Sequence, residues 1–144
     1  MKRFVLTLLI VLFAAAAVQA RMVSIAGTRV NMRSGPGTRY PAQWELGSGF
    51  PLKVLGREGK WLRVIDFEGD SGWVFSRLTS KKPTVIVSKK LVNIRRGPGT
   101  KYRVVGTAAY GTVLKLLKRG KGWVRVQHSG NRIGWIRRTL VWGL

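Results

Sequence analysis

The stretch VNMRSGPGTRY at residues 30–40 recurs as VNIRRGPGTKY at residues 92–102, and this recurrence decides the fold. The same offset of 62 positions aligns residues 22–78 with residues 84–140 without a gap, and 20 of the 57 aligned pairs are identical. Self-similarity at a fixed spacing is the signature of a duplicated folding unit. The sequence therefore predicts two copies of one small domain.

A polar segment, TSKKP at residues 79–83, separates the two copies and ends in a proline, which is typical of a linker. We therefore predict a first domain at residues 21–78, a linker at residues 79–83 and a second domain at residues 84–144. The chain contains no cysteine, so each domain must be held together by packing without a disulfide bond.

The N-terminal residues have the pattern of a secretory signal peptide. A basic start, MKR, precedes an apolar run from Phe4 to Val18, and the run ends in VQA, which resembles a cleavage site. The run is shorter than the ~20 apolar residues that a membrane-spanning helix needs. We predict a helical signal peptide at residues 1–20, an exported protein of the periplasm or extracellular cell envelope, and no transmembrane segment in the mature chain. An uncleaved N-terminal anchor is the alternative.

Within each copy, short runs of Val, Ile, Leu and Trp are separated by Gly, Pro, Asn and Asp, a pattern of β-strands and turns. We expect a long loop through each Gly-Pro-Gly, and tight hairpins at Glu58–Lys60 and Lys121–Gly122. The expected strands are residues 23–26, 29–33, 50–57, 61–65 and 71–75 in the first copy, and residues 85–88, 91–95, 112–119, 123–127 and 133–137 in the second. The sequence therefore predicts an all-β protein.

The alternation of residues along the central strand predicts which side chains face the core. Successive strand residues point to opposite faces, so Leu62 and Val64 are expected inside while Trp61 and Arg63 face outward. The second copy repeats this arrangement 62 positions further on. Each copy is therefore expected to present a tryptophan beside an arginine on its outer surface.

Both copies resemble the bacterial SH3-like domain family, whose members combine an Asn-x-Arg-x-Gly-Pro-Gly-x-x-Tyr opening with a central Trp and a closing Gly-Trp. The opening lies at residues 31–40 and 93–102, and the central residue is Trp61 or Trp123. The resemblance covers nearly all of residues 21–144 and implies two tandem small SH3-like β-barrels, each partly open. It also implies a targeting module of extracytoplasmic proteins, since in several wall hydrolases such domains bind peptidoglycan, often its peptide.

The charges are divided unevenly between the two copies. The chain has 27 Lys and Arg against 5 Asp and Glu. Residues 21–78 carry nine basic and five acidic residues, whereas residues 79–144 carry sixteen basic residues and no acidic one. A positive field attracts anionic partners. We expect a cell-wall polymer or an envelope protein as partner, with anionic lipid head groups as a further one; nucleic acid is not expected, because exported proteins rarely meet it.

Aromatic side chains next to arginines are the candidate ligand-binding residues. An outward Trp beside an Arg, with a Tyr from the long loop, makes an apolar platform that suits a peptide or sugar bearing a carboxylate. Arg33 and Arg95 join the set because a guanidinium can grip a carboxylate through two hydrogen bonds. The candidates are Tyr40, Trp61, Arg63 and Arg33 in the first copy, and Tyr102, Trp123, Arg125 and Arg95 in the second. The alternatives are that these aromatics only seal the loop onto the barrel and that Arg33 and Arg95 pack along the loop.

No pattern in the sequence favours catalysis, a cofactor or a metal site. His128 is the only histidine and has no acid near it in the sequence, so a general base or metal ligand is not expected there. The acids of residues 66–70 lack the Gly and Glu that a calcium loop needs. We predict a non-enzymatic envelope module that binds peptidoglycan peptide or glycan. The alternative is an interaction protein that docks a protein, or an anionic lipid or polymer, through the basic second domain.

Overall fold

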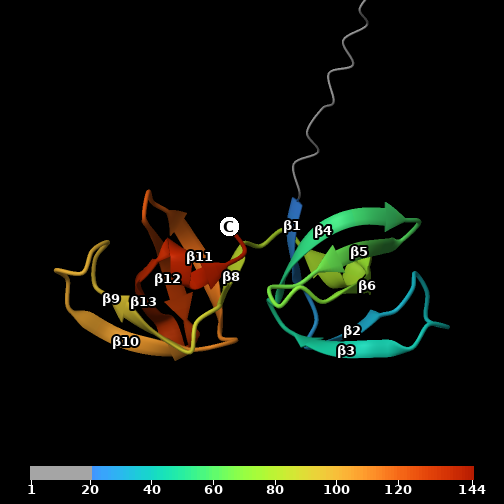
Figure 1. The fold of residues 1–144 in the computed structure, drawn as a ribbon, viewed down its shortest axis with the longest axis horizontal. Helices are drawn as coiled ribbons and strands as arrows, with labels where there is room; N and C mark the ends of the chain where they lie inside the picture. The colour runs from blue at the N-terminus through green and yellow to red at the C-terminus, as the bar shows by residue number, and fades with distance from the viewer. Residues whose placement is uncertain (1–20) are drawn as a thin grey trace, which may run out of the picture.

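The computed structural model describes residues 21–144, so the signal peptide predicted for residues 1–20 lies outside the described residues. Figure 1 shows two β-rich units side by side. The described part of the chain has no helix with the length and apolar character needed to span a membrane. Its helical turns are the short 3-10 segments η1 (Ser76–Leu78), η2 (Ser129–Asn131) and η3 (Arg138–Leu140).

The first unit is one antiparallel sheet with the strand order β3-β2-β6-β5-β4-β1-β7. Its strands are β1 (Arg21–Ile25), β2 (Arg29–Arg33), β3 (Ala42–Gly47), β4 (Pro51–Glu58), β5 (Trp61–Ile65), β6 (Ser71–Phe75) and β7 (Thr79–Ser80). Thr79 and Ser80 belong to the segment expected to be a linker, and they pair with β1. Only residues 81–83 therefore lie between the strands of the two sheets.

The second unit repeats this order as β10-β9-β13-β12-β11-β8-β14. Its strands are β8 (Thr84–Val87), β9 (Leu91–Arg95), β10 (Val104–Ala109), β11 (Val113–Arg119), β12 (Trp123–His128), β13 (Arg132–Arg137) and β14 (Val141–Trp142). The strand register repeats as well, since Arg33 lies opposite Trp73 in the first sheet and Arg95 opposite Trp135 in the second. The strand pairing therefore repeats with the same spacing of 62 residues as the sequence.

Each sheet bends around its own aliphatic core (Figure 1). The first core consists of Val23, Ile25, Val30, Met32, Leu46, Leu52, Leu62, Val64 and Val74. The second consists of Val85, Val87, Val92, Ile94, Ala108, Leu114, Leu116, Val124, Val126, Ile136 and Val141. Within the described residues the two outermost strands of each sheet do not pair with each other. The all-β prediction is confirmed, and each of the expected, partly open barrels is a strongly bent sheet that does not close.

Two strands lie where the sequence predicted only a long loop. β3 follows the first Gly-Pro-Gly and β10 follows the second, and each pairs with one neighbour at the edge of its sheet. Only Leu46 of β3 and Ala108 of β10 are buried. An edge strand that sends one side chain into the core has no apolar alternation, which is the signal that identifies strands in a sequence.

The central strand of the first unit has the predicted orientation. Leu62 and Val64 are fully buried, Arg63 is exposed and Trp61 is half-buried. The expected hairpin joins β4 to β5, with Glu58 opposite Trp61 and a positive φ at Gly59 that a glycine adopts without strain. The hairpin therefore presents Trp61 at the start of β5, on the outer face of the sheet.

The turn between β5 and β6 is organised by a buried carboxylate. The backbone N–H groups of Glu68 and Asp70 each donate to Asp66 Oδ1 at 2.9 Å. Burial raises the pKa of Asp66 above its ordinary value, although these two hydrogen bonds favour the charged form and act in the opposite direction. The same oxygen thus anchors the turn while its charge is poorly hydrated.

Two substitutions of Asp66 separate the effect of its hydrogen bonds on stability from the effect of its buried charge. A folded-state pKa that lies above the unfolded one contributes stability at low pH, and this contribution is lost as the pH rises through the raised pKa. Asp66→Asn keeps the accepting oxygen without the charge, so we expect it to match or exceed the parent in stability at neutral pH. Asp66→Ala leaves the two N–H groups unpaired and should cost about 1–3 kcal/mol. Thermal unfolding of the parent and both variants from acid to neutral pH checks this, and equal losses for Asn and Ala would contradict it.

Candidate ligand-binding face

The outer face of β2, β6 and β5 carries a strip of aromatic and cationic side chains. Trp61 lies opposite Phe75, and their ring centroids are 5.5 Å apart. Arg63 lies opposite Trp73, which in turn lies opposite Arg33. Directly paired residues of an antiparallel sheet share a face. The register therefore assembles one continuous strip from three strands.

A shallow groove of about 240 Å³ lies beside the Trp61–Phe75 pair. It is lined by Arg29, Val30, Asn31, Arg33, Thr38, Trp61, Phe75 and Leu78. An amide, a hydroxyl and two guanidinium groups thus border two aromatic rings. The Arg29 Nε atom donates to Glu45 Oε1 at 2.9 Å, so part of its charge is balanced within the first domain. Stacking surface combined with a few polar groups is typical of ligand sites.

Arg33 holds the loop that borders this groove. Its Nη1 atom donates to the carbonyl oxygens of Tyr40 at 2.9 Å and of Thr38 at 3.3 Å. Arg95 repeats these contacts with the carbonyls of Tyr102 and Thr100, at 2.9 Å and 3.1 Å. Of the two roles weighed for these arginines, the structure thus shows packing along the loop. Binding of a ligand carboxylate by either one stays a prediction.

The two loop tyrosines pack on their own loops. A Cβ atom added to Gly35 would lie 2.5 Å from Cδ1 of the Tyr40 ring, so the ring rests against the glycine backbone. Arg39 covers the same ring at 5.0 Å, and its Nη2 atom donates to Tyr40 Oη at 3.1 Å, a hydrogen bond that raises the pKa of Arg39. Tyr102 repeats this packing against Gly97, with Lys101 over its ring at 5.3 Å. None of the aromatic contacts within residues 21–144 joins either tyrosine to the outward tryptophans. A platform shared by the tyrosines and those tryptophans therefore stays a prediction.

The second domain replaces the aromatic pair with a cation on an aromatic ring. Arg137 occupies the position that corresponds to Phe75, and its guanidinium lies 5.0 Å from the centre of the Trp123 ring. Arg125 is exposed on β12 beside this pair. One face of Trp123 is thus covered by a charged side chain of the same domain. The two domains therefore present different surfaces at the same place in the fold.

Six groove residues were not among the sequence candidates, namely Arg29, Val30, Asn31, Thr38, Phe75 and Leu78. Asn31 and Thr38 line the groove together with Phe75. Phe75 was detectable in principle, because it lies two residues after Trp73 on the same strand and therefore on the same face. Its contact with Trp61 depends on the register of β5 against β6, which the sequence alone does not give.

A metal-binding arrangement is missing from residues 21–144, where no three His, Cys, Asp or Glu side chains gather. His128 Nδ1 shares a hydrogen bond of 2.9 Å with Ser129 Oγ. The chemistry that the described strip offers is therefore stacking, hydrogen bonding and attraction of anions.

Comparison with curated proteins finds a relative in Bacillus subtilis (strain 168) described as "Putative N-acetylmuramoyl-L-alanine amidase YrvJ". The two are 29% identical over 128 aligned positions, and the alignment covers 81% of this chain and 24% of the relative. The chain thus spans about a quarter of the length of that curated relative.

Among solved structures, NlpC2 from Trichomonas vaginalis is 17% identical, with 88% of this chain and 49% of that chain covered and a TM-score of 0.39. An NlpC/P60 family protein from Bacillus cereus ATCC 10987 is 15% identical, with 84% and 55% covered and a TM-score of 0.39. At these values the structural likeness carries no weight for function.

A profile of the bacterial SH3 domain matches the chain twice, at residues 26–81 and at residues 88–143. Each match covers one sheet except for its first strand, β1 or β8, and includes one copy of the Gly-Pro-Gly loop and one outward tryptophan. The chain therefore belongs to the bacterial SH3 domain family and contains two such domains in tandem.

Proposed function

We propose that this protein is a non-catalytic binding module of the cell envelope that recognises peptidoglycan peptide or glycan through the groove of its first domain. The observation that carries the proposal is the Trp61–Phe75 pair beside Asn31, Arg33 and Thr38. The rings offer stacking area, and the polar groups offer hydrogen bonds to amides, hydroxyls and carboxylates. This combination suits a peptide or a sugar that carries a carboxylate.

Two further points support the wall as the target. The curated relative is described as an amidase whose substrate name, N-acetylmuramoyl-L-alanine, is a peptidoglycan linkage, and this chain aligns with a quarter of it. The N-terminal pattern of residues 1–20 favours export to the periplasm or extracellular envelope, where the wall lies. In this proposal the second domain contributes positive charge, which raises the rate of encounter with an anionic surface.

Binding to purified sacculi tests the proposal. The parent should sediment with sacculi, and Trp61→Ala should reduce the bound fraction about tenfold, because a buried aromatic anchor carries much of a binding energy. Trp44→Ala is the matched control, since Trp44 is exposed on β3 and does not line the groove. Circular dichroism confirms that both variants are folded. A parent that stays in the supernatant at low salt, or a Trp61→Ala variant that binds as well as the parent, contradicts the proposal.

The charge distribution favours a second candidate, an interaction protein that binds anionic lipid or polymer through the basic domain at residues 84–144. Exposed charges are screened as ionic strength rises. Binding to vesicles that contain phosphatidylglycerol, if it is the main activity, should therefore disappear at high salt. Binding to sacculi that persists at high salt and depends on Trp61 favours the groove over this candidate.

A further inference from the structure

The two domains pack directly against each other as well as being joined by the chain. Thr84 Oγ1 donates to the carbonyl oxygen of Gly49 at 2.6 Å. The ring of Phe67 lies between Phe50 of its own domain and Tyr110 of the second domain, with centroid distances of 6.0 and 5.3 Å. A hydrogen bond and an aromatic contact therefore join the two domains.

The junction requires a close approach of the backbone at Gly49. This residue has a φ of 78°, and a Cβ atom there would lie 3.3 Å from Val113 Cγ1 of the second domain. The pKa of Tyr110 is raised, first by loss of hydration and second by the negative charges of Glu68 and Asp66. The acidic turn of the first domain thus lies close to the basic domain, which favours their association.

A cleft of about 780 Å³ remains at this junction. Ile25 and Ser48 of the first domain line it, Lys82 comes from the connecting segment, and Lys115, Leu116 and Gln127 come from the second domain. The volume falls in the range of small-molecule sites, and such sites form preferentially between domains. Neither domain alone possesses this cleft.

The charged side chains that line the cleft are basic. Its charged side chains are Lys82 and Lys115, and no Asp or Glu of the described residues lines it. Ser24 Oγ donates to the Lys82 carbonyl oxygen at 2.8 Å and shares a 2.9 Å hydrogen bond with Ser80 Oγ, which fixes the backbone that carries Lys82. Val113 and Leu117 supply apolar lining from the second domain. Two lysines from different segments thus line a cleft that also offers hydroxyl groups and apolar surface, and this lining suits a small ligand with two anionic groups.

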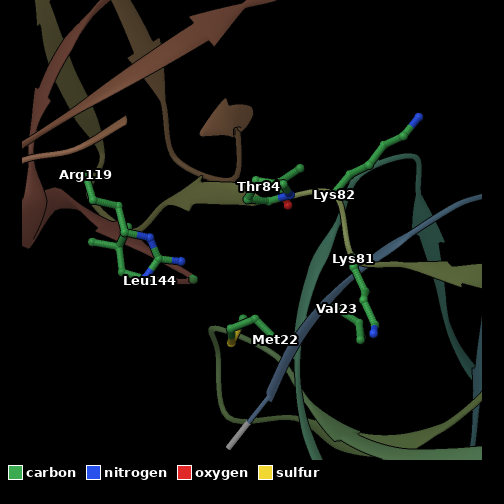
Figure 2. A pocket seen from close by; sticks show the side chains of 9 residues that line it. Met22, Val23, Lys81, Lys82, Thr84, Arg119 and Leu144 are labelled. Carbon is green, nitrogen blue, oxygen red and sulfur yellow. The ribbon is translucent and has the colours of Figure 1, made fainter. Parts of the chain in front are cut away.

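Lys81, the residue before Lys82 in the chain, provides a comparison for it. Figure 2 shows a smaller hollow on the connecting segment, lined by Lys81 and Lys82 together with Arg119 and Leu144. Its volume is about 310 Å³. In this view the side chains of Lys81 and Lys82 extend in opposite directions. Lys81 does not line the larger cleft. Lys82 thus lines both hollows, whereas Lys81 lines the smaller one and not the larger cleft. Lys81 is therefore a control residue with the same charge at the adjacent position in the chain.

We propose that the junction cleft is a second ligand site, separate from the groove at Trp61, for a small molecule that carries two anionic groups, either carboxylates or phosphates. The site exists only in the docked tandem, because both domains and the connecting segment contribute to it. It does not depend on recognition of the wall by the first domain, so either proposal can fail without the other.

Nuclear magnetic resonance titration of the chain with pyrophosphate and, separately, with the dipeptide Glu-Glu tests this site. At least one probe should give saturable shifts of the amides of Ser80, Lys82 and Lys115, with no shift of the Trp61 indole. The probe that binds more tightly identifies the anionic group as phosphate or carboxylate. Absence of saturation with both probes, or shifts spread evenly over the basic domain, overturns the proposal.

Variants separate the cleft from general charge. Lys82→Gln combined with Lys115→Gln should weaken binding of the preferred probe about tenfold, since both ammonium groups are lost. Lys81→Gln combined with Lys118→Gln removes the same charge from side chains outside the cleft and should weaken it less than about twofold. Equal losses in the two double variants would show that the probe responds to net charge and would overturn the site.

Discussion

Gly134→Ala is expected to unfold the second domain at a markedly lower temperature than the first. Gly134 is buried on β13, and a Cβ atom there would collide with the Ile94 side chain and lie 2.9 Å from the carbonyl oxygen of Arg95. The backbone oxygen cannot move without breaking the sheet, and the branched Ile94 has little rotamer freedom. Overpacking of this kind costs about 1–3 kcal/mol. In a domain of this size each kcal/mol lowers the unfolding midpoint by about 4–8 °C.

A matched glycine in the same domain provides the control. Gly106 lies on β10, and a Cβ atom there would meet no atom within 4 Å. Gly106→Ala should therefore leave the midpoint nearly unchanged. Thermal unfolding followed by circular dichroism compares the two variants, and resolved amide signals show which domain unfolds first. A Gly106→Ala variant as unstable as Gly134→Ala would mean that a steric clash is not the cause.

Exchange of one residue between the domains is expected to weaken binding by the first domain and to allow binding by the second. Phe75→Arg should place a guanidinium over Trp61, as Arg137 lies over Trp123 in the second domain. The aromatic wall of the groove would be lost, and binding to sacculi should fall about tenfold, the equivalent of about 1.4 kcal/mol. Arg137→Phe should in turn restore an aromatic pair in the second domain and allow it to bind when the first is disabled.

The charge change in this exchange works against the expected result, which makes the test demanding. An added positive charge strengthens attraction to an anionic wall, so weaker binding by Phe75→Arg has to come from the groove itself. Ser76→Arg adds the same charge one position further on and corresponds to Arg138 of the second domain. It should bind at least as well as the parent in the sacculus assay. Unchanged binding by Phe75→Arg, or equal weakening by Ser76→Arg, contradicts the groove as the binding site.

Strands with a strong apolar alternation were predictable from the sequence. β2, β5 and β6 have the boundaries expected at residues 29–33, 61–65 and 71–75, because each sends alternate side chains into a core. β3 was not predictable, because Leu46 is the only buried side chain it contributes. An edge strand is defined by the neighbour that it pairs with, and this pairing lies outside its own sequence pattern.

The candidate site was predictable to a smaller extent than the fold. The outward direction of Trp61 follows from alternation alone and agrees with the structure. The position of Tyr40 depends on the backbone path of the Gly-Pro-Gly loop, which places the ring against Gly35. The contact between Trp61 and Phe75 depends on strand register. Register and loop path are tertiary properties, and a one-residue slip would change both neighbours.

The docked junction gives the tandem a property that neither domain has alone. The Thr84–Gly49 hydrogen bond and the Phe67–Tyr110 contact hold the two outer faces at one separation. When a tethered pair binds a repeating polymer, the second contact is favoured only where the polymer offers sites at that separation. If both outer faces contacted one polymer strand, a fixed separation between them would make the avidity depend on how far the polymer is stretched.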